Sequence, residues 1–451
     1  MDKGLLYSYI DNAADTICRL SDAIWDYAEL SMAEHRSAAA YIALLKENGF
    51  QVQEQLAGLP TAFSGSYGTG KPVIGILGEF DALSGLSQVS GACCEEASVP
   101  GGNGHGCGHN LLGAASLGAA IAIKEQIQAG NLTGTIVFYG CPGEEGCAGK
   151  TFMARDGIFR DLDAALCWHP DDYNAVSTGS NYASLQVEYT FKGIAAHAAG
   201  APEHGRSALD AAELMNIGVQ FLREHMPQNS SIHYAFTNTG GISPNVVQPL
   251  AKVVYMVRGK DVRSVKALLT RVDKIAEGAA LMTETAVSSH QIDGTSNTIS
   301  NTVLEKLLYE NLCNTPKPCY TEEELSFAEK LRATFSDSPT APLNTAVEPY
   351  TPSNMIHPGS TDVGDVSWLT PTAQFTAVTW PEGIPGHSWQ IVSAGKSGIA
   401  HKGMLYAAKV LAATTADLME QPATIEAARK EFDIATVQGY DCPITTDVTP
   451  L

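Results

Sequence analysis

The chain has few basic residues for its length. Its 451 residues include 28 lysines and arginines against 49 aspartates and glutamates, which gives a formal net charge of −21 at pH 7. A surface of this sign repels phosphate backbones unless basic side chains are concentrated in one place, and no run of Lys or Arg occurs. We therefore expect no binding to nucleic acid.

The sequence also lacks a long apolar run and a regular pattern of cysteines, and no targeting signal is expected from its first residues. No stretch of about 18 apolar residues occurs, so neither a membrane span nor a membrane partner is expected. Residues 1–7 show no basic region followed by an apolar core. The ten cysteines are scattered, which favours reduced thiols and a cytoplasmic location over a disulfide framework.

The most informative stretch that is present is GHGCGHN at residues 104–110. Cys107 and His109 stand one residue apart between glycines, so a tight turn can direct a thiolate and an imidazole to one point. The start of the helix that follows would favour negative charge there. Taken alone, a Gly-rich turn around a buried structural thiol is the commoner explanation.

Carboxylates and further histidines follow along the chain. Glu144 and Glu145 are adjacent, so one can bind a metal while the other faces a bound water, although acidic residues at a helix start are also common. His169 and His387 are equivocal individually, and Asp81 could orient a ligand histidine or cap a helix. Together these residue types form the ligand set of a hydrolytic divalent metal site with a carboxylate left to activate water. The sequence therefore predicts a metal-dependent hydrolase.

Apolar periodicity predicts an α/β fold. Residues 72–78, 135–140 and 164–168 are short apolar runs typical of buried strands, and Asp81, the glutamate pair and His169 each follow one of them. Ligands bind at the carboxyl ends of strands in such sheets. Residues 182–292 read as β-α-β-β-α-β, an open-faced α+β sandwich. We expect a discontinuous domain of residues 1–180 and 298–451, with a mixed sheet and helices on both faces, and an inserted smaller domain of residues 181–297. Residues 317–352 are rich in loops.

Seven segments, in their order along nearly the whole chain, resemble the M20 family of metallopeptidases and amidohydrolases, and within it the amidohydrolase branch. They are GEFDAL (78–83), GHGCGHNLL (104–112), CPGEEG (141–146), FKGIAAH (191–197), SPNVV (243–247), GSTDVGD (359–365) and PGHS (385–388).

The resemblance implies a site with two divalent ions, Zn²⁺ or Mn²⁺, and Glu144 as the general base. The smaller domain would be a lid or dimerisation domain, from which His197 would reach the active site of the partner subunit and polarise the scissile carbonyl. Asn245 would help to bind the substrate or the oxyanion. By the same resemblance, the metal ligands would be Cys107, His109, Glu145, His169 and His387.

The expected reaction is hydrolysis of the amide bond of a small N-acyl amino acid such as p-aminobenzoyl-glutamate by a homodimer or a hetero-oligomer. Arg258 or Arg206 could meet a substrate carboxylate bidentately, although surface ion pairing explains both equally well. Gly359, Ser360 and Thr361 are expected to line the substrate pocket. Two alternatives stay open: a dipeptidase or another N-acyl amino acid deacylase, and a non-catalytic partner subunit, against which the intact ligand set argues.

Overall fold

The computed structural model describes residues 1–336 and 341–450, which divide into two compact units. The larger unit contains Met1–Gly179, Ile299–Met355 and Val366–Tyr440, and the smaller unit contains Ser180–Thr298, Ile356–Asp365 and the C-terminal residues from Asp441. The short helix α10 (Val363–Ser367) spans one of the boundaries. Each unit has a hydrophobic core of its own.

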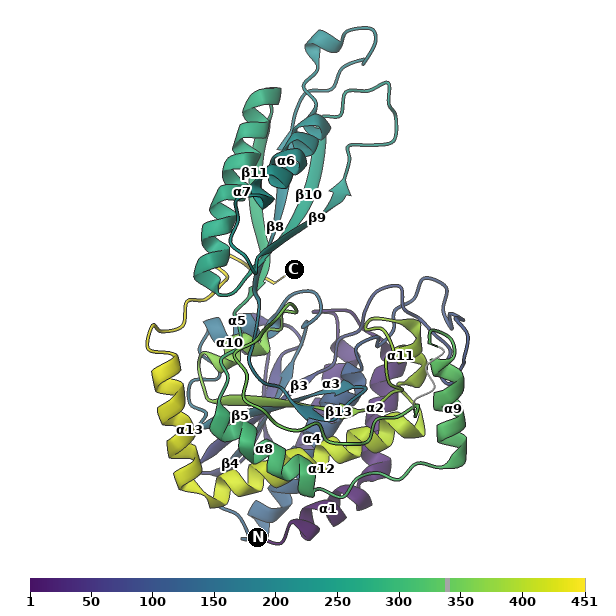
Figure 1. The fold of residues 1–451 in the computed structure, drawn as a ribbon, viewed down its shortest axis with the longest axis vertical. Helices are drawn as coiled ribbons and strands as arrows, with labels where there is room; N and C mark the ends of the chain where they lie inside the picture. The colour runs from purple at the N-terminus through teal and green to yellow at the C-terminus, as the bar shows by residue number, and fades with distance from the viewer. Residues whose placement is uncertain (337–340, 451) are drawn as a thin grey trace. The chain divides into compact units, whose positions relative to one another are not determined.

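The larger unit is built on a mixed sheet. In order across the sheet, its strands are β1 (Gln51–Glu54), β2 (Phe63–Thr69), β4 (Gly134–Cys141), β3 (Val73–Glu79), β5 (Ala164–Asp171), β13 (Thr372–Val378) and β6 (Ala175–Val176). The central strands β3, β4, β5 and β13 are labelled in Figure 1. Strands β4, β3, β5 and β13 run parallel in the centre, whereas β1, β2 and β6 pair antiparallel with their neighbours. The central strands are buried on both faces, which explains why they read as continuous apolar runs.

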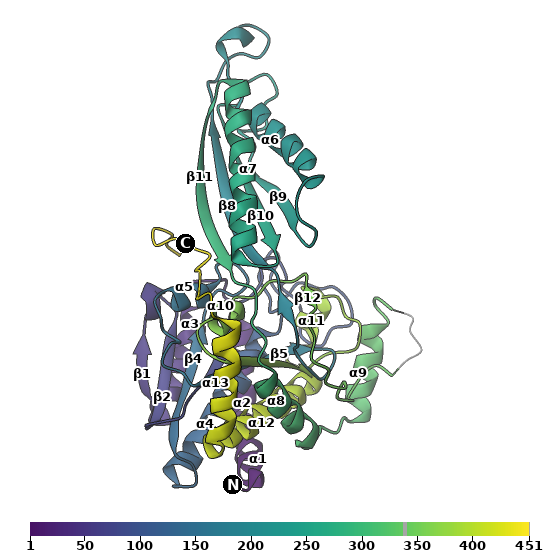
Figure 2. The ribbon, with the colours of Figure 1, turned by 60° about the vertical axis from the view of Figure 1, so that its left-hand side comes forward.

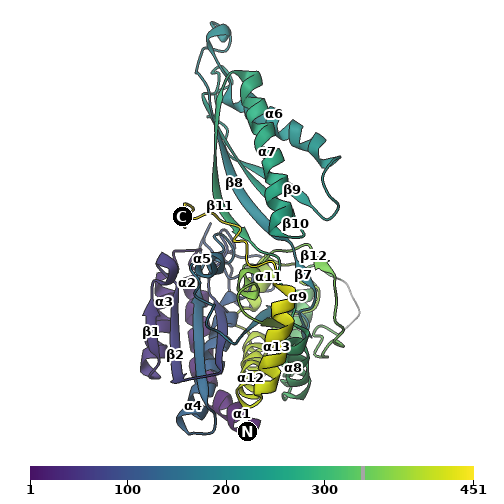
Figure 3. The same ribbon diagram turned by 90° about the vertical axis from the view of Figure 1, so that its left-hand side faces the viewer.

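Helices surround this sheet. They are α1 (Lys3–Asn12), α2 (Ala14–Tyr27), α3 (His35–Glu47), α4 (His109–Gln128), α5 (Gly149–Arg155), α8 (Thr302–Asn314), α9 (Glu322–Arg332), α11 (Trp389–Ala394), α12 (Gly398–Glu420) and α13 (Pro422–Ala435). The alanine-rich helices α4 and α12 pack against each other and against the central strands, with α1 and α2 outside them. Helix α13 lies beside α12 and α8 (Figure 3).

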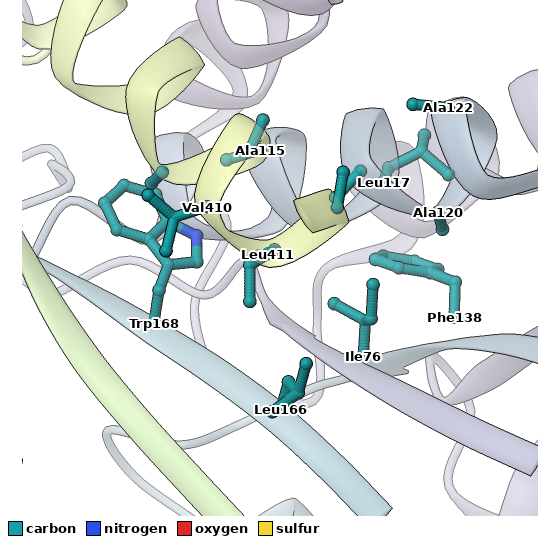
Figure 4. Packing of buried hydrophobic residues seen from close by; sticks show 14 of the residues in the cluster. Ile76, Ala115, Leu117, Ala120, Ala122, Phe138, Leu166, Trp168, Val410 and Leu411 are labelled. Carbon is teal, nitrogen blue, oxygen red and sulfur yellow. The ribbon is translucent and has the colours of Figure 1, made fainter. Parts of the chain in front are cut away.

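The core between the sheet and these two helices is built from large side chains on the strands and small ones on the helices. Phe138, Leu166 and Trp168 point from β4 and β5 toward Leu117 of α4 and Leu411 of α12 (Figure 4), and all of them are almost completely buried. Because alanines fill most of the remaining helix surface, the helix backbones can approach the sheet closely. This packing holds the carboxyl ends of the central strands in place.

The smaller unit is an open-faced sandwich. Its main sheet has the order β11 (Ala286–Thr295), β8 (Ala183–Lys192), β10 (Leu250–Gly259) and β9 (Ser231–Asn238), all antiparallel. Helices α6 (Ala208–Arg223) and α7 (Val262–Thr283) cover one face (Figure 2), so every second residue of β10 is buried. A parallel pair, β7 (Ser180–Asn181) and β12 (Ile356–His357), completes the unit.

The structure confirms the expected fold class of a mixed α/β sheet flanked by helices together with a β-α-β-β-α-β sandwich. Among residues 1–336 and 341–450, no helix combines the length and the apolar character needed to cross a bilayer.

Candidate metal centre

The residues singled out in the larger unit lie at the carboxyl ends of adjacent parallel strands. Asp81 follows β3, Glu144 and Glu145 follow β4, and His169 is the third residue from the end of β5. Because β3 lies between β4 and β5, these side chains meet at one edge of the sheet, where ligands bind in folds of this kind.

The Gly-rich turn delivers two further side chains to this edge. Gly108 has φ +72°, a left-handed conformation that favours glycine, and a methyl group there would lie 3.0 Å from Pro170 and from Trp380. Helix α4 begins at the next residue, His109, which is fully buried. The turn thereby places the sulfur of Cys107 and the ring of His109 side by side.

The buried His109 and the half-buried His169 both present Nε2 to this space. His109 donates its Nδ1–H to Asp81 Oδ1 at 3.0 Å, and His169 donates its Nδ1–H to the Pro170 carbonyl at 2.7 Å. Partners of this kind set the tautomer and the ring orientation of metal-binding histidines. Ligand atoms of Cys107, His109 and His169 all lie within 4.8 Å of one another.

The ionisation of the side chains at this point is compatible with a bound cation. Burial lowers the pKa of His169 to about 4, so its imidazole is neutral at neutral pH, the form that binds metal. Burial also raises the pKa of Cys107 to about 12, so its thiol ionises near neutral pH only with a cation beside it. For Asp81, burial alone would raise the pKa, but hydrogen bonds from His109, the Glu145 backbone and Ser31 lower it to about 2. The Asp81 carboxylate is therefore negatively charged and lies on the Nδ1 side of the His109 ring.

The adjacent glutamates belong to different groups of ligand atoms. Glu145 lies with Cys107 and His387, and its Oε1 is 3.5 Å from His387 Nε2. Glu144 lies with His109 and Glu79 instead. Ligand atoms within each group are no more than 4.8 Å apart. The two carboxylates are thus directed to neighbouring but separate positions.

Two buried polar atoms test whether a metal fits here. His109 Nε2 and Glu145 Oε1 are inaccessible to water and make no hydrogen bond with a described residue. Each has one polar neighbour at a longer distance, Glu79 Oε2 at 3.3 Å from His109 Nε2 and His387 Nε2 at 3.5 Å from Glu145 Oε1. Buried polar atoms are nearly always satisfied, and an unsatisfied one requires an explanation such as an ion. Imidazole, thiolate and carboxylate donors suit zinc, and the nitrogen and oxygen donors also suit manganese. The residues fit a divalent metal site.

Sequence reasoning missed two residues next to this site. Glu79, the last residue of β3, has Oε2 at 3.3 Å from His109 Nε2, and its Oε1 is 2.6 Å from Lys150 Nζ on α5. Both side chains are buried. A buried lysine has no local signature in the sequence. By contrast, His105 is turned away: its Nε2 is 3.0 Å from the Ile24 carbonyl, and burial lowers its pKa to about 4.

The remaining predicted site residues belong to the smaller unit. His197 is exposed, and its Nδ1 accepts the backbone N–H groups of Ala199 and Gly200 at 3.2 and 3.0 Å. The proton of the neutral ring therefore lies on Nε2, which makes this atom a hydrogen-bond donor. The segment is paired with that of Asn245, whose backbone carbonyl accepts the N–H of Ala198 at 3.0 Å.

The two candidate arginines differ in their surroundings. Arg206 is paired with Glu284, with Nη2 and Oε2 2.9 Å apart. The half-buried guanidinium of Arg258 has no hydrogen bond or ion pair with any residue that the structure describes, and its Nε is buried.

The three loop residues expected to line the pocket are also in this unit. The Gly359 carbonyl accepts the N–H of Tyr182 at 3.0 Å, and the Thr361 hydroxyl accepts the N–H of Val363 at 3.3 Å. The Ser360 hydroxyl oxygen is buried without a partner among the described residues.

Comparisons with known proteins agree with this chemistry. The sequence model of Peptidase family M20/M25/M40 matches residues 76–373. The chain is 44% identical to a subunit of the p-aminobenzoyl-glutamate hydrolase of Escherichia coli (strain K12), over 99% of this chain and 98% of that one. It is 30% identical to the Xaa-Arg dipeptidase of Mus musculus, over 94% and 90% of the two chains. The fold is similar to that of the Bacillus subtilis YXEP protein, a dinuclear metal-binding peptidase, with a TM-score of 0.58 and 17% identity over 91% and 99% of the chains.

Proposed function

The chain belongs to peptidase family M20/M25/M40, and on that premise we propose that it hydrolyses the amide bond of an N-acyl amino acid such as p-aminobenzoyl-glutamate with the help of bound divalent ions. The observation that carries the proposal is the divergence of Glu144 and Glu145 from one loop into two neighbouring groups of ligand atoms. One carboxylate can then bind metal while the other stays available for proton transfer.

In this proposal five side chains hold two ions, Zn²⁺ or Mn²⁺: Cys107, His109, Glu145, His169 and His387. Bound ions of this kind acidify water and polarise a carbonyl. Glu144 takes the proton of the attacking water and passes it to the leaving amine. Asp81 keeps His109 in the tautomer that presents Nε2, since it accepts the Nδ1–H.

The smaller unit would supply the groups that recognise the substrate. His197 Nε2–H and the Asn245 side chain are the donors for the negatively charged tetrahedral intermediate. Arg258, whose guanidinium has no partner among the described residues, would bind the substrate carboxylate bidentately. Gly359, Ser360 and Thr361 would line the pocket, where the orphaned Ser360 hydroxyl is free to meet a polar substrate group.

An oligomer is part of the proposal, with His197 acting in the active site of a partner subunit. Helix α6 presents the exposed apolar side chains of Ile217 and Phe221, which suits an interface. The relative from Escherichia coli is named a subunit, so a second kind of chain is the alternative partner. Mixing inactive His197→Ala and Glu144→Gln subunits should restore activity in hybrid dimers. Hybrids that form and stay inactive would exclude action in trans.

A dipeptidase is the second candidate, favoured by the match to the Xaa-Arg dipeptidase. Enzyme loaded separately with zinc and with manganese should be assayed for amine release from a panel of N-acyl amino acids and dipeptides, with p-aminobenzoyl-glutamate included. The preferred class of substrate decides between the two. Metal bound without turnover of any substrate would instead support a non-catalytic partner subunit.

Two glutamine variants test the roles of the glutamates. Glu144→Gln should retain both ions and lose turnover by a factor of about 10² or more, since it removes the base. Glu145→Gln should lose metal as well as activity. Near wild-type rates in Glu144→Gln would remove it as the base.

A further inference from the structure

A carboxyl group from the N-terminal part of the chain reaches the loop that carries the two glutamates. Glu34 is fully buried, and its Oε1 accepts the backbone N–H of Gly143 at 2.9 Å. Its Oε2 accepts the hydroxyl of Thr61 at 2.8 Å. Gly143, which directly precedes Glu144, has φ +68°, and a methyl group there would lie 2.9 Å from Met32 Cε. The loop at Gly143 is therefore closely packed against the segment that contains Glu34.

The same segment supports the loop at a second point. The backbone N–H of Glu145 donates to Asp81 Oδ2 at 3.0 Å, and the Ser31 hydroxyl donates to the same oxygen at 2.8 Å. The segment itself is tied to the residue after Asp81, because Ala82 N–H donates to the Glu29 carbonyl at 2.8 Å. Thus the N–H groups on either side of Glu144 are both held by buried carboxylates.

Helix capping does not explain the position of Glu34. Glu34 is the N-cap residue of α3, but its side chain makes no capping hydrogen bond. That task is performed by Glu29, whose carboxylate accepts the backbone N–H groups of Arg36 and Ser37 at 3.0 and 2.9 Å. A buried carboxyl is costly unless it has partners, and burial followed by the nearby charge of Asp81 raises the pKa of Glu34 to about 7. The hydrogen bond between Glu34 and the Gly143 N–H therefore forms even though the surroundings disfavour the charged form of the Glu34 carboxyl.

We propose that Glu34 is a positioning residue that fixes the backbone from Gly143 to Glu145, so that Glu144 and Glu145 diverge toward their separate groups of ligand atoms. The inference rests on the proposed function for the roles of these two glutamates. It requires only a hydrogen-bond acceptor at Glu34 Oε1, because the partner is a backbone N–H. An amide oxygen should therefore replace the carboxylate.

Three variants at this position separate positioning from general stability. Glu34→Gln keeps an acceptor for Gly143 and polar contact with Thr61, so turnover and metal affinity should stay within about threefold of wild type. Glu34→Ala removes the acceptor and should weaken metal binding and lower kcat by about 10- to 100-fold, with KM changed much less. Glu34→Asp, one methylene shorter, should fold even if the alanine variant does not and should show the same loss.

Glu305→Ala is the matched control. Glu305 is a buried glutamate on α8 of the same unit that accepts hydrogen bonds from Ser300 and Tyr350. This variant should lose thermal stability while keeping metal affinity and kcat. If Glu34→Ala and Glu34→Asp also keep both properties, or if Glu34→Gln fails as they do, the positioning role is wrong.

Metal binding is measured by titrating Zn²⁺ and Mn²⁺ into each metal-free variant, and this readout does not depend on substrate. If wild-type protein hydrolyses no substrate of the panel, the proposed function fails. The difference in metal affinity between Glu34→Gln and Glu34→Ala still decides the positioning role.

Discussion

The buried pair between Lys150 and Glu79 leads to a quantitative prediction for stability. The Nζ–Oε1 distance is 2.6 Å, and the side chains are 0% and 3% exposed. Burial alone would raise the pKa of Glu79, but Lys150 and the rings of His109 and His169 lower it, so the carboxylate is charged. Two unit charges at this distance attract by about 6 kcal/mol at an effective dielectric constant of about 20. Lys150→Met preserves most of the side-chain volume and removes this attraction.

We expect Lys150→Met to lower the free energy of unfolding of the larger unit by about 3–5 kcal/mol, because Glu79 stays buried without its cation. The measurement is urea unfolding of metal-free protein, since bound ions would add stability of their own. Tryptophan fluorescence reports on the larger unit alone, because all five tryptophans of the chain belong to it: Trp25, Trp168, Trp368, Trp380 and Trp389.

A double-mutant cycle identifies the cause. If the loss arises from the pair, Glu79→Gln in the Lys150→Met background should recover about 2–3 kcal/mol relative to the sum of the single effects. Lys124→Met is the control, because Lys124 pairs with Glu125, whose side chain is 33% exposed, and should cost no more than about 1 kcal/mol. Strictly additive single effects would refute the reasoning.

Three further predictions concern pH, packing and metal. Burial lowers the pKa of His401, but its hydrogen bond to Asp22 outweighs this and raises the pKa to about 9. The protonated His401 therefore stabilises the folded state fully below pH 6.5, and this stabilisation disappears as the pH rises through 9. His401→Asn should lower the free energy of unfolding by about 1–2 kcal/mol at low pH, after solvent screening, and by almost nothing above pH 9. Urea titrations across this pH range measure the difference. Gly403→Ala places a methyl group 1.9 Å from a β13 carbonyl oxygen and should lower the melting temperature strongly, whereas Gly278→Ala meets nothing within 4 Å and should gain about 0.5–1 kcal/mol by calorimetry. Adding Zn²⁺ at about 100 times its Kd should raise the free energy of unfolding of metal-free wild type by about 2.7 kcal/mol. His109→Ala should lose most of this gain when both proteins are unfolded thermally with and without Zn²⁺.

Local patterns were sufficient to predict the elements that carry the site. Strands β3, β4 and β5 are apolar runs of the length typical of buried parallel strands, and Asp81 and Glu144 follow β3 and β4 within two and three residues. Helix α9 was missed, because it lies within residues 317–352, which read as loops, and is mostly polar. A capping box of Thr321 and Glu324 marks its start and was a readable signal. Residues 337–340 of that stretch lie outside those that the structure describes.

The candidate ligands and their supporting residues differ in how far residue type reveals them. Metal chemistry restricts ligands to a few side chains, so residue type and spacing made Cys107 and His109 candidate ligands, and the resemblance to the M20 family supplied the rest of the candidate set. By contrast, a backbone N–H can be held by any side chain that carries a hydrogen-bond acceptor and is long enough to reach it, and many types of side chain meet this requirement. Glu34 performs that task from 109 positions away in the chain, and no local pattern distinguishes it from an ordinary N-cap residue. The ligand set could therefore be proposed from sequence, whereas the contacts that hold Glu144 and Glu145 apart depend on the folded structure.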